Sequence, residues 1–213
     1  MARGRLIVFE GAEGVGKSTQ LRRLATWLES GGRVVHALRE PGGTPLGDEI
    51  RRLLLDPNSV VAPRAEALLF MASRAQLVEA LVRPALAAGH VVLLDRFFLS
   101  TYAYQGAGRG LPEREVMEAN AVATSGLVPD LTLLLALPVA EGLARAAKRG
   151  ERDRMERNAD EFHHRVAGAF ATFATAAWQA GHPECGPIET VDAAGGEEEV
   201  FARIRALVEP RLP

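Results

Sequence analysis

The fold of this chain is decided by the stretch Gly11-Ala12-Glu13-Gly14-Val15-Gly16-Lys17-Ser18, which fits the phosphate-loop pattern G-x-x-x-x-G-K-[ST] at every fixed position. The apolar run at residues 6–9 precedes it and is typical of a buried strand. Leu21, Leu24 and Leu28 follow it at helical spacing. A strand, a loop and a helix in this order form the context in which the motif binds phosphate.

The loop has the chemistry of a nucleoside triphosphate site. Its glycines let backbone N–H groups turn inward, and together with the helix N-terminus these groups form a nest for a polyphosphate. Lys17 adds positive charge, and the Ser18 hydroxyl is placed to ligate Mg²⁺. A glycine-rich turn with a chance Lys-Ser pair is the alternative, but the strand and helix favour a nucleoside triphosphate site at Gly11 through Thr19.

Composition predicts one compact α/β domain over residues 1–213, with a flexible insert. A chain of 213 residues, 47% of them hydrophobic, can bury a sizeable core; chains of this size hide about 70% of the surface that their unfolded form exposes. The formal net charge of −2 provides no overall field that would favour nucleic acid or an anionic membrane. We therefore expect neither as a partner.

Cysteine content and the apolar runs favour a cytoplasmic protein. The single cysteine, Cys185, cannot form an internal disulfide, which suits a reducing compartment. The opening residues are basic, but the apolar run behind them is four residues long, too short for a signal peptide or a membrane span.

The second predicted strand, residues 34–38, is followed by Arg39-Glu40-Pro41-Gly42-Gly43-Thr44. Ligands bind at the carboxyl ends of strands in an open parallel sheet, so this charged, glycine-pinned stretch is a candidate binding loop. Considered alone, it is also compatible with a surface turn. A short helix with Arg51 near its middle follows.

A long helical pattern runs from Pro63 to Gly89, and Phe70 and Arg74 stand four residues apart on one face of it. An aromatic ring beside a guanidinium could bind a nucleobase, one by stacking and the other by hydrogen bonding. Phe70 alone would more often be a core residue.

The third strand, residues 91–94, is continuously apolar and ends in Asp95-Arg96. A carboxylate at that strand end sits where the acidic partner of a phosphate loop reaches Mg²⁺. A polar and aromatic stretch, residues 97–106, follows it. We therefore predict that Ser18 and Asp95 hold the metal.

Further strands are expected at residues 131–137 and 187–191, with helices before, between and after them. Five strands that alternate with helices predict an α/β fold with a five-stranded, parallel, doubly wound sheet. Between Arg145 and Arg157 the chain is crowded with charge. Such a run is usually a solvated face, but beside a polyphosphate site an arginine-rich segment at about residues 145–157 is a candidate lid.

Taken together, these stretches resemble the bacterial thymidylate kinases, nucleoside monophosphate kinases of the phosphate-loop class, in order over nearly the whole chain. The matching segments are residues 9–19, 39–44, 69–74, 95–97, 103–106, 129–132 and 149–156. The phosphate loop is shared by many families, whereas Arg-Glu-Pro-Gly-Gly-Thr with Tyr-Gln-Gly is more specific. A tyrosine often stands in the family where this chain has Phe97.

The resemblance implies phosphorylation of dTMP to dTDP by ATP, with Mg²⁺, in a homodimer. It places Phe70 on the thymine ring and Arg74 at its exocyclic oxygen, with Thr101 and Gln105 reading the rest of the edge. It implies acceptor-phosphate binding by Arg39, Arg51 and Arg96, a position near the deoxyribose for Glu10 and Tyr104, and ATP binding by Arg145. The residues that it implies for catalysis are Lys17, Arg96, Arg149, Glu10 and Asp95.

Charge considerations support this implication independently. A nucleoside monophosphate is already an anion, with a second phosphate pKa near ~6, so its attacking oxygen needs little help from a base. The obstacle is to bring two anions together, and positive charge on both sides of the transferred group removes it. Some relatives carry an arginine within the phosphate loop. Glu13-Gly14 occupies that space here, so the lid must supply the charge, and Arg149 is the expected donor.

Three other functions use the same loop. A GTP-binding switch should carry Asn-Lys-x-Asp, and no asparagine of this chain precedes a lysine. A kinase for a deoxynucleoside or for another monophosphate is closer. A non-catalytic ATP-binding module would leave the arginines at the strand ends and in the lid without a purpose.

Overall fold

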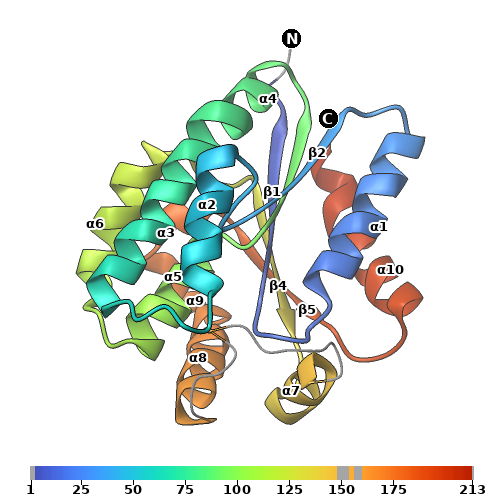
Figure 1. Ribbon diagram of the computed structural model, residues 1–213. Helices are drawn as coiled ribbons and strands as arrows, with labels where there is room; N and C mark the ends of the chain where they lie inside the picture. Colours follow the sequence, from blue (N-terminus) through green and yellow to red (C-terminus); the bar gives the residue numbers. More distant parts are fainter. Residues whose placement is uncertain (1–2, 148–153, 156–159, 213) are drawn as a thin grey trace.

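The computed structural model describes residues 3–147, 154–155 and 160–212. Its centre is a parallel sheet of five strands in the order β2-β3-β1-β4-β5 (Figure 1). The strands are β1 (Arg5–Glu10), β2 (Val35–Arg39), β3 (Val91–Asp95), β4 (Leu131–Ala136) and β5 (Ile188–Asp192). The predicted sheet is therefore confirmed. Each strand lies within one residue of its expected position at either end.

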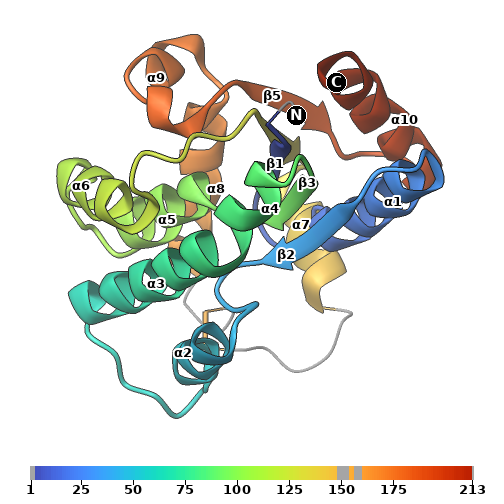
Figure 2. The same ribbon diagram turned by 90° about the horizontal axis from the view of Figure 1, so that it is seen from above.

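Helices cover both faces of the sheet. Helices α1 (Lys17–Ser30) and α10 (Glu197–Val208) lie on one face and most of the others on the opposite face (Figures 1 and 2). These others are α2 (Pro45–Leu55), α3 (Pro63–Leu77), α4 (Arg83–Ala87), α5 (Phe98–Thr101), α6 (Glu113–Thr124), α8 (Asp160–Phe173) and α9 (Ala176–Ala180). Alternate strand residues face the two layers, so Leu93 packs against the α1 side and Leu94 against the other. The continuous apolar runs of β1, β3 and β4 are buried for this reason.

Two helical stretches differ from the expected pattern. The predicted helix over residues 63–89 contains a π-helical segment, Val78–Val82, between α3 and α4. Pro84 is the second residue of α4, and because it lacks an N–H group it cannot donate a hydrogen bond to the preceding helical turn. Residues 98–108, which the sequence pattern left unassigned, form α5 and the π-helical segment Tyr102–Gly108.

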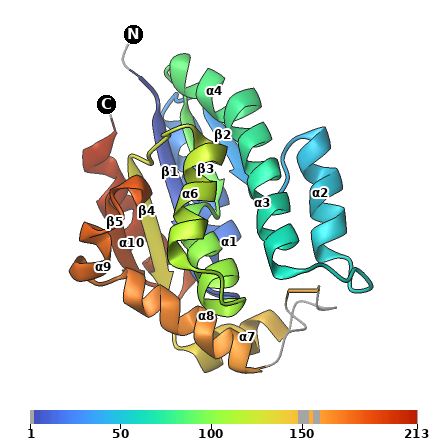
Figure 3. The same cartoon turned by 90° about the vertical axis from the view of Figure 1, so that its left-hand side faces the viewer.

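Functional residues meet at the carboxyl edge of the sheet. Residues 9 and 39 both pair with Asp95 in the strand register, so β1, β2 and β3 end side by side. Helix α7 (Val139–Ala147) lies at this edge, below the strand ends in Figure 1. Helix α2 stands beside α3, away from the sheet (Figure 3). No helix within the described ranges is long and apolar enough to cross a membrane.

Candidate active site

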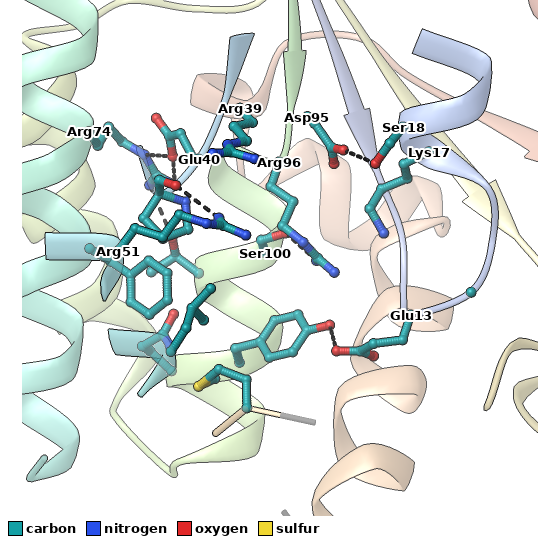
Figure 4. Close-up of a pocket in the computed structure, with 18 of the residues that line it drawn as sticks. Glu13, Lys17, Ser18, Arg39, Glu40, Arg51, Arg74, Asp95, Arg96 and Ser100 are labelled. Carbon is teal, nitrogen blue, oxygen red and sulfur yellow. Dashed lines mark hydrogen bonds and ion pairs between the residues drawn. The ribbon is translucent and has the colours of Figure 1, made fainter. Parts of the chain in front are cut away.

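A pocket of about 310 Å³ opens at the carboxyl edge of β1, β2 and β3. It extends from the phosphate loop to helix α3, and Arg96 lies between the two ends (Figure 4). The sequence-predicted residues among its lining are Glu13, Gly14, Gly16, Lys17, Ser18, Thr19, Arg39, Arg51, Phe70, Arg74, Asp95, Arg96, Thr101, Tyr104 and Gln105. The fold thus brings residues from five separate sequence segments into one cavity.

The phosphate loop has the expected backbone. Gly16 precedes α1 with a φ of 91°, in the left-handed region that glycine tolerates best. At Gly14 a Cβ atom would lie 1.9 Å from the carbonyl oxygen of Gly142 in α7, so only glycine fits there. Lys17 is 7% exposed, and its Nζ donates to the carbonyl oxygens of Gly11 (2.8 Å) and Ala12 (2.7 Å).

Burial controls the charge of Lys17. Removal from water, together with the nearby Arg96 guanidinium, lowers the pKa of Lys17 from 10.5 to about 7. The carboxylates of Asp95, Glu13 and Glu10 act in the opposite direction without cancelling this effect. An anion placed beside Nζ would favour the ammonium form, so the charge of this residue depends on what the pocket holds.

Ser18 and Asp95 lie together, as the sequence predicted. The Ser18 hydroxyl donates a hydrogen bond of 2.6 Å to Asp95 Oδ2 (Figure 4). Asp95 is the last residue of β3 and Ser18 stands in the first turn of α1. A hydroxyl and a carboxylate are oxygen donors of the kind that Mg²⁺ prefers. Within the described ranges no group of three His, Cys, Asp or Glu side chains could hold a metal, so a Mg²⁺ here would depend on phosphate oxygens.

Arg96 has an unusual backbone conformation. Its φ is 72°, in the left-handed region that few non-glycine residues occupy. Its guanidinium lies 5.0 Å from the Tyr104 ring centroid, and its Nη1 donates to Ser100 Oγ at 2.9 Å. Burial lowers the pKa of Arg96, but Tyr104 and the carboxylates of Glu13 and Asp95 raise it by more, so the residue is a permanent cation.

Glu10 lies behind the pocket. It is fully buried, and its carboxylate accepts from the Phe97 N–H (2.8 Å), the Ser100 N–H (3.0 Å) and the Ser100 hydroxyl (2.7 Å). These bonds hold the turn that carries Arg96 from β3 into α5. Glu10 therefore supports the pocket from behind, and its expected contact with a sugar remains a prediction.

Glu13 is the loop carboxylate that lines the pocket. Tyr104 donates its hydroxyl to Glu13 Oε1 (Figure 4). Burial raises the pKa of Glu13, but Arg96, the Tyr104 hydrogen bond and Lys17 together outweigh it, so the pKa lies below its ordinary value. The pocket therefore contains a carboxylate at its phosphate-loop end as well as several cations.

Arg74 is held by an extensive network at the far end of the pocket. The side chain is 2% exposed and pairs with the buried Glu40, whose Oε2 lies 2.8 Å from Nε and 2.6 Å from Nη2. Nη2 also donates to the Phe97 carbonyl, and Nη1 donates to Thr101 Oγ1 (3.0 Å) and to Asn120. All three guanidinium nitrogens are thus engaged by protein groups. The expected hydrogen bond from Arg74 to a base remains a prediction.

The remaining expected substrate residues surround this end. Phe70 is half-buried and, like Arg74, lines the pocket from α3, as their spacing predicted. Arg39 ends β2, and Arg51 donates to the Pro41 carbonyl at 2.9 Å. Thr101 and Gln105 are buried on α5 and the π-helical segment.

A second hollow, of about 230 Å³, lies on the other side of the phosphate loop. Its walls are Gly14, Val15, Gly16, Thr19, Gln20, Arg145, Ala193, Gly195, Glu197 and Val200. Arg145 pairs with Glu141 in α7 at 2.5 Å. This hollow places Arg145 beside the loop to which the sequence assigned it.

Comparisons with known proteins agree with this geometry. The sequence model of the family described as thymidylate kinase matches residues 9–200. The chain belongs to the thymidylate kinase family. The thymidylate kinase of Deinococcus radiodurans is 46% identical over 99% of both chains. That of Thermosynechococcus vestitus is 50% identical over 80% of this chain and 76% of its own length. The crystal structure of thymidylate kinase from Ehrlichia chaffeensis matches with a TM-score of 0.75 and 26% identity, over 97% of this chain and 99% of that one.

Membership in the thymidylate kinase family makes the chain a phosphotransferase that acts on nucleotides. The predicted fold class and family are therefore confirmed. Individual residue roles are a separate question, because the comparisons do not assign them.

The predicted lid lies mostly outside the described residues. Arg149 and the rest of residues 148–153 and 156–159 are not described. Arg145 lies two residues before the end of the described part at Ala147, and Arg154 and Met155 are described between the two gaps. Arg154 donates to the Leu54 carbonyl (2.7 Å) and to the Glu66 carboxylate (2.7 Å), so it is anchored between α2 and α3.

Sequence reasoning missed the acidic partners of the pocket. Glu40 was recognised as part of a charged pair, but its ion pair with Arg74 links positions 34 residues apart. Asn120, a neutral partner of Arg74, gave no local signal. The one available clue for Glu66 is its place in a helix that also carries Phe70 and Arg74, with a carboxylate on an otherwise buried face.

Proposed function

We propose that the chain transfers the γ-phosphoryl group of ATP to dTMP, giving dTDP and ADP. The observation that carries the proposal is the single pocket that joins a phosphate loop to a compartment lined by Phe70, Arg74, Thr101 and Gln105. A phosphate oxygen of dTMP attacks the γ-phosphorus, and the bond to the bridging oxygen of ADP breaks. The relatives named thymidylate kinase over nearly the whole chain length support the same assignment.

The residues divide into two groups by the anion that they would hold. Backbone N–H groups of the phosphate loop and Lys17 would bind the phosphates of ATP, and the hollow beside Arg145 would receive the rest of that nucleotide. Arg39, Arg51 and Arg96 line the pocket on the acceptor side, where they would hold the phosphate of dTMP. Tyr104 lines the same pocket and donates its hydroxyl to Glu13 of the phosphate loop, and these two side chains could bond a sugar hydroxyl.

Mg²⁺ would be held by Ser18 and, directly or through water, by Asp95. The 2.6 Å contact between the two side chains supports this site. A bound ion would supply positive charge that offsets the negative charge of the phosphates. The protein residues supply the rest, because Lys17 and Arg96 place positive charge on either side of the transferred group.

The acceptor preference tests the function. The rate constant kcat/KM for dTMP should exceed that for dUMP by a modest factor, because one methyl group in an apolar pocket is worth about 1–3 kcal/mol. Discrimination against dCMP should be larger, since its base edge exchanges a hydrogen-bond acceptor for a donor. A coupled ADP-release assay with ATP and a panel of nucleosides and monophosphates measures all of these. Equal kcat/KM for dTMP and dCMP would contradict the assignment, and preference for a nucleoside would favour a different kinase.

Binding of ATP should take up protons above neutral pH. In the free protein the pKa of Lys17 is about 7, so at pH 8 most Nζ groups are neutral. Phosphates beside Nζ favour the charged form, so we expect an uptake approaching one proton per ATP at pH 8, and little uptake below pH 6. Isothermal titration calorimetry in buffers of different ionisation enthalpy measures it. The variant Lys17→Met should lose the uptake. No uptake by the unmodified protein would mean that Lys17 is already charged.

We further propose that the chain acts as a homodimer. Helices α3 and α6 pack side by side and carry exposed apolar side chains, Leu68 at 65%, Met117 at 38% and Val122 at 84% (Figure 3). Such side chains on adjacent helices suit burial against a second copy.

A cytoplasmic location is proposed as well, because the buried free thiol of Cys185 is compatible with a reducing compartment.

A further inference from the structure

Glu66 forms a buried anionic centre beside the acceptor end of the pocket. It lies on α3, is fully buried and is absent from the pocket lining among the described residues. Its Oε1 accepts from Gln105 Nε2 (3.0 Å) and Arg109 Nε (3.1 Å). Its Oε2 accepts from Arg109 Nη2 (3.2 Å) and Arg154 Nη2 (2.7 Å). Each oxygen thus accepts two hydrogen bonds, which fills the ordinary capacity of a carboxylate.

These contacts keep Glu66 ionised. Burial raises the pKa of the carboxyl group, but the hydrogen bonds from Arg109, Gln105 and Arg154 and the charge of Arg109 outweigh it, so the pKa lies below its ordinary value. An ionised carboxylate accepts hydrogen bonds and cannot donate them. A polar group in contact with the Glu66 carboxylate must therefore be a hydrogen-bond donor.

This requirement fixes the amide of Gln105. With the Nε2 group toward Glu66, the amide makes a hydrogen bond. A flipped amide would put its carbonyl oxygen against a carboxylate oxygen, and two acceptors repel each other. Because the oxygen and the nitrogen of an amide point in different directions, Oε1 points away from Glu66. Within the described part of the chain the one side-chain hydrogen bond of Gln105 is this bond through Nε2. Because Gln105 lines the pocket, we take Oε1 as the acceptor that a ligand there can reach.

We propose that Glu66 is a specificity-determining positioning residue, which selects the base of the acceptor by holding Gln105 with its carbonyl oxygen toward the pocket. This inference rests on the proposed function. Thymine and uracil carry an N–H donor at N3, which a carbonyl oxygen can accept. Cytosine has an acceptor at N3, which the same oxygen repels. Glu66 thereby contributes to the rejection of cytosine without touching the base.

The variant Glu66→Gln tests the proposal with almost no change in shape. The new side-chain amide has an NH₂ group that can donate to the Gln105 carbonyl oxygen as well as an oxygen that can accept from Gln105 Nε2. The Gln105 amide can then bond to residue 66 in either orientation. We expect the ratio of kcat/KM for dTMP to kcat/KM for dCMP to fall at least about tenfold, through a higher KM for dTMP more than through kcat. Kinetics are measured well below the melting temperature of each variant. The matched surface variant Glu115→Gln, which removes an exposed carboxylate paired with Arg64, should leave the ratio unchanged.

A second control separates base selection from anchoring of the segment at Arg154. Arg154→Met removes a partner from Oε2 and leaves the Gln105 bond on Oε1 intact. We expect it to change the ratio less than about twofold. If Arg154→Met lowers the ratio as much as Glu66→Gln does, Glu66 acts through that anchor and the proposal is wrong.

Coupling to Gln105 gives the decisive measurement. Gln105→Met alone should lower the ratio, and it should lower it much less in the Glu66→Gln background, because the two residues act through one hydrogen bond. Independent effects of the two substitutions on the ratio would overturn the inference, as would a folded Glu66→Gln variant with an unchanged ratio. If Glu66→Gln does not fold, Glu66→Asp keeps the charge, withdraws the carboxylate from Gln105 and should lower the ratio too. An unmodified chain that phosphorylates neither nucleotide would instead overturn the proposed function.

Discussion

Replacement of Arg149 by alanine is expected to lower kcat by at least about a hundredfold, with little change in the KM for dTMP or in the melting temperature. Negative charge at the transferred phosphoryl group needs a cationic donor, and the phosphate loop of this chain, residues 11–18, contains no arginine. An arginine that acts in this way is worth about 10³–10⁵ in kcat, or roughly 4–7 kcal/mol of transition-state stabilisation. Steady-state kinetics with saturating ATP measure the loss.

Arg152→Ala is the matched control, because this residue lies in the same segment but the resemblance implies no role for it, and its effect should be mild. Arg154 is a poor substitute for Arg149, since it is anchored to the Leu54 carbonyl and to Glu66. A loss of less than about threefold for Arg149→Ala would show that the charge comes from another residue.

Asp95→Asn should lower kcat by about a hundredfold and raise the Mg²⁺ concentration needed for half-maximal activity. The substitution removes the negative charge that faces the Ser18 hydroxyl while it preserves the size of the side chain. A neutral amide is a weaker ligand for Mg²⁺ than a carboxylate, whether it binds the ion directly or through water. Activity measured over a range of Mg²⁺ concentrations at fixed ATP checks the expectation.

Ser18→Ala removes the other oxygen of this pair and should shift the Mg²⁺ requirement in the same direction. Unchanged metal dependence and turnover for Asp95→Asn would mean that Asp95 serves as a structural partner of its neighbours alone. Such a result would not affect the proposed preference for dTMP, because the residues proposed to bind the base, Phe70, Arg74 and Gln105, are not the residues proposed to bind the metal.

The parts of the fold that follow from local sequence were predictable. Continuous apolar runs indicated β1, β3 and β4, because a buried parallel strand needs apolar side chains on both faces. All five strands begin and end within one residue of the predicted positions. The meeting of Ser18 and Asp95 was also predictable, since parallel strands end at a common edge and both residues stand at element ends there. In such cases a short stretch of chain and one topological rule determine the contact.

Contacts that depend on tertiary packing were not predictable in this way. The bonds of Glu10 to residues 97 and 100, of Glu40 to Arg74 and of Glu66 to Gln105 link positions 34 to 90 residues apart. A glutamate in a sequence gives no sign that it will be buried, and most are exposed. The helical stretch at residues 98–108 was missed as well, because its polar and aromatic residues have no apolar stripe of helical period.

The left-handed backbone of Arg96 has a consequence for the evolution of this protein. A non-glycine residue in that region stores about 1–3 kcal/mol of conformational energy, which the surrounding contacts must offset. Three hydrogen bonds to the Glu10 carboxylate hold the following turn in place. Glycine at position 96 would relieve the strain, yet the guanidinium over Tyr104 would be lost. With the role proposed above for Arg96, stability and phosphate binding place opposite demands on this position, so Arg96→Gly should gain stability and lose activity.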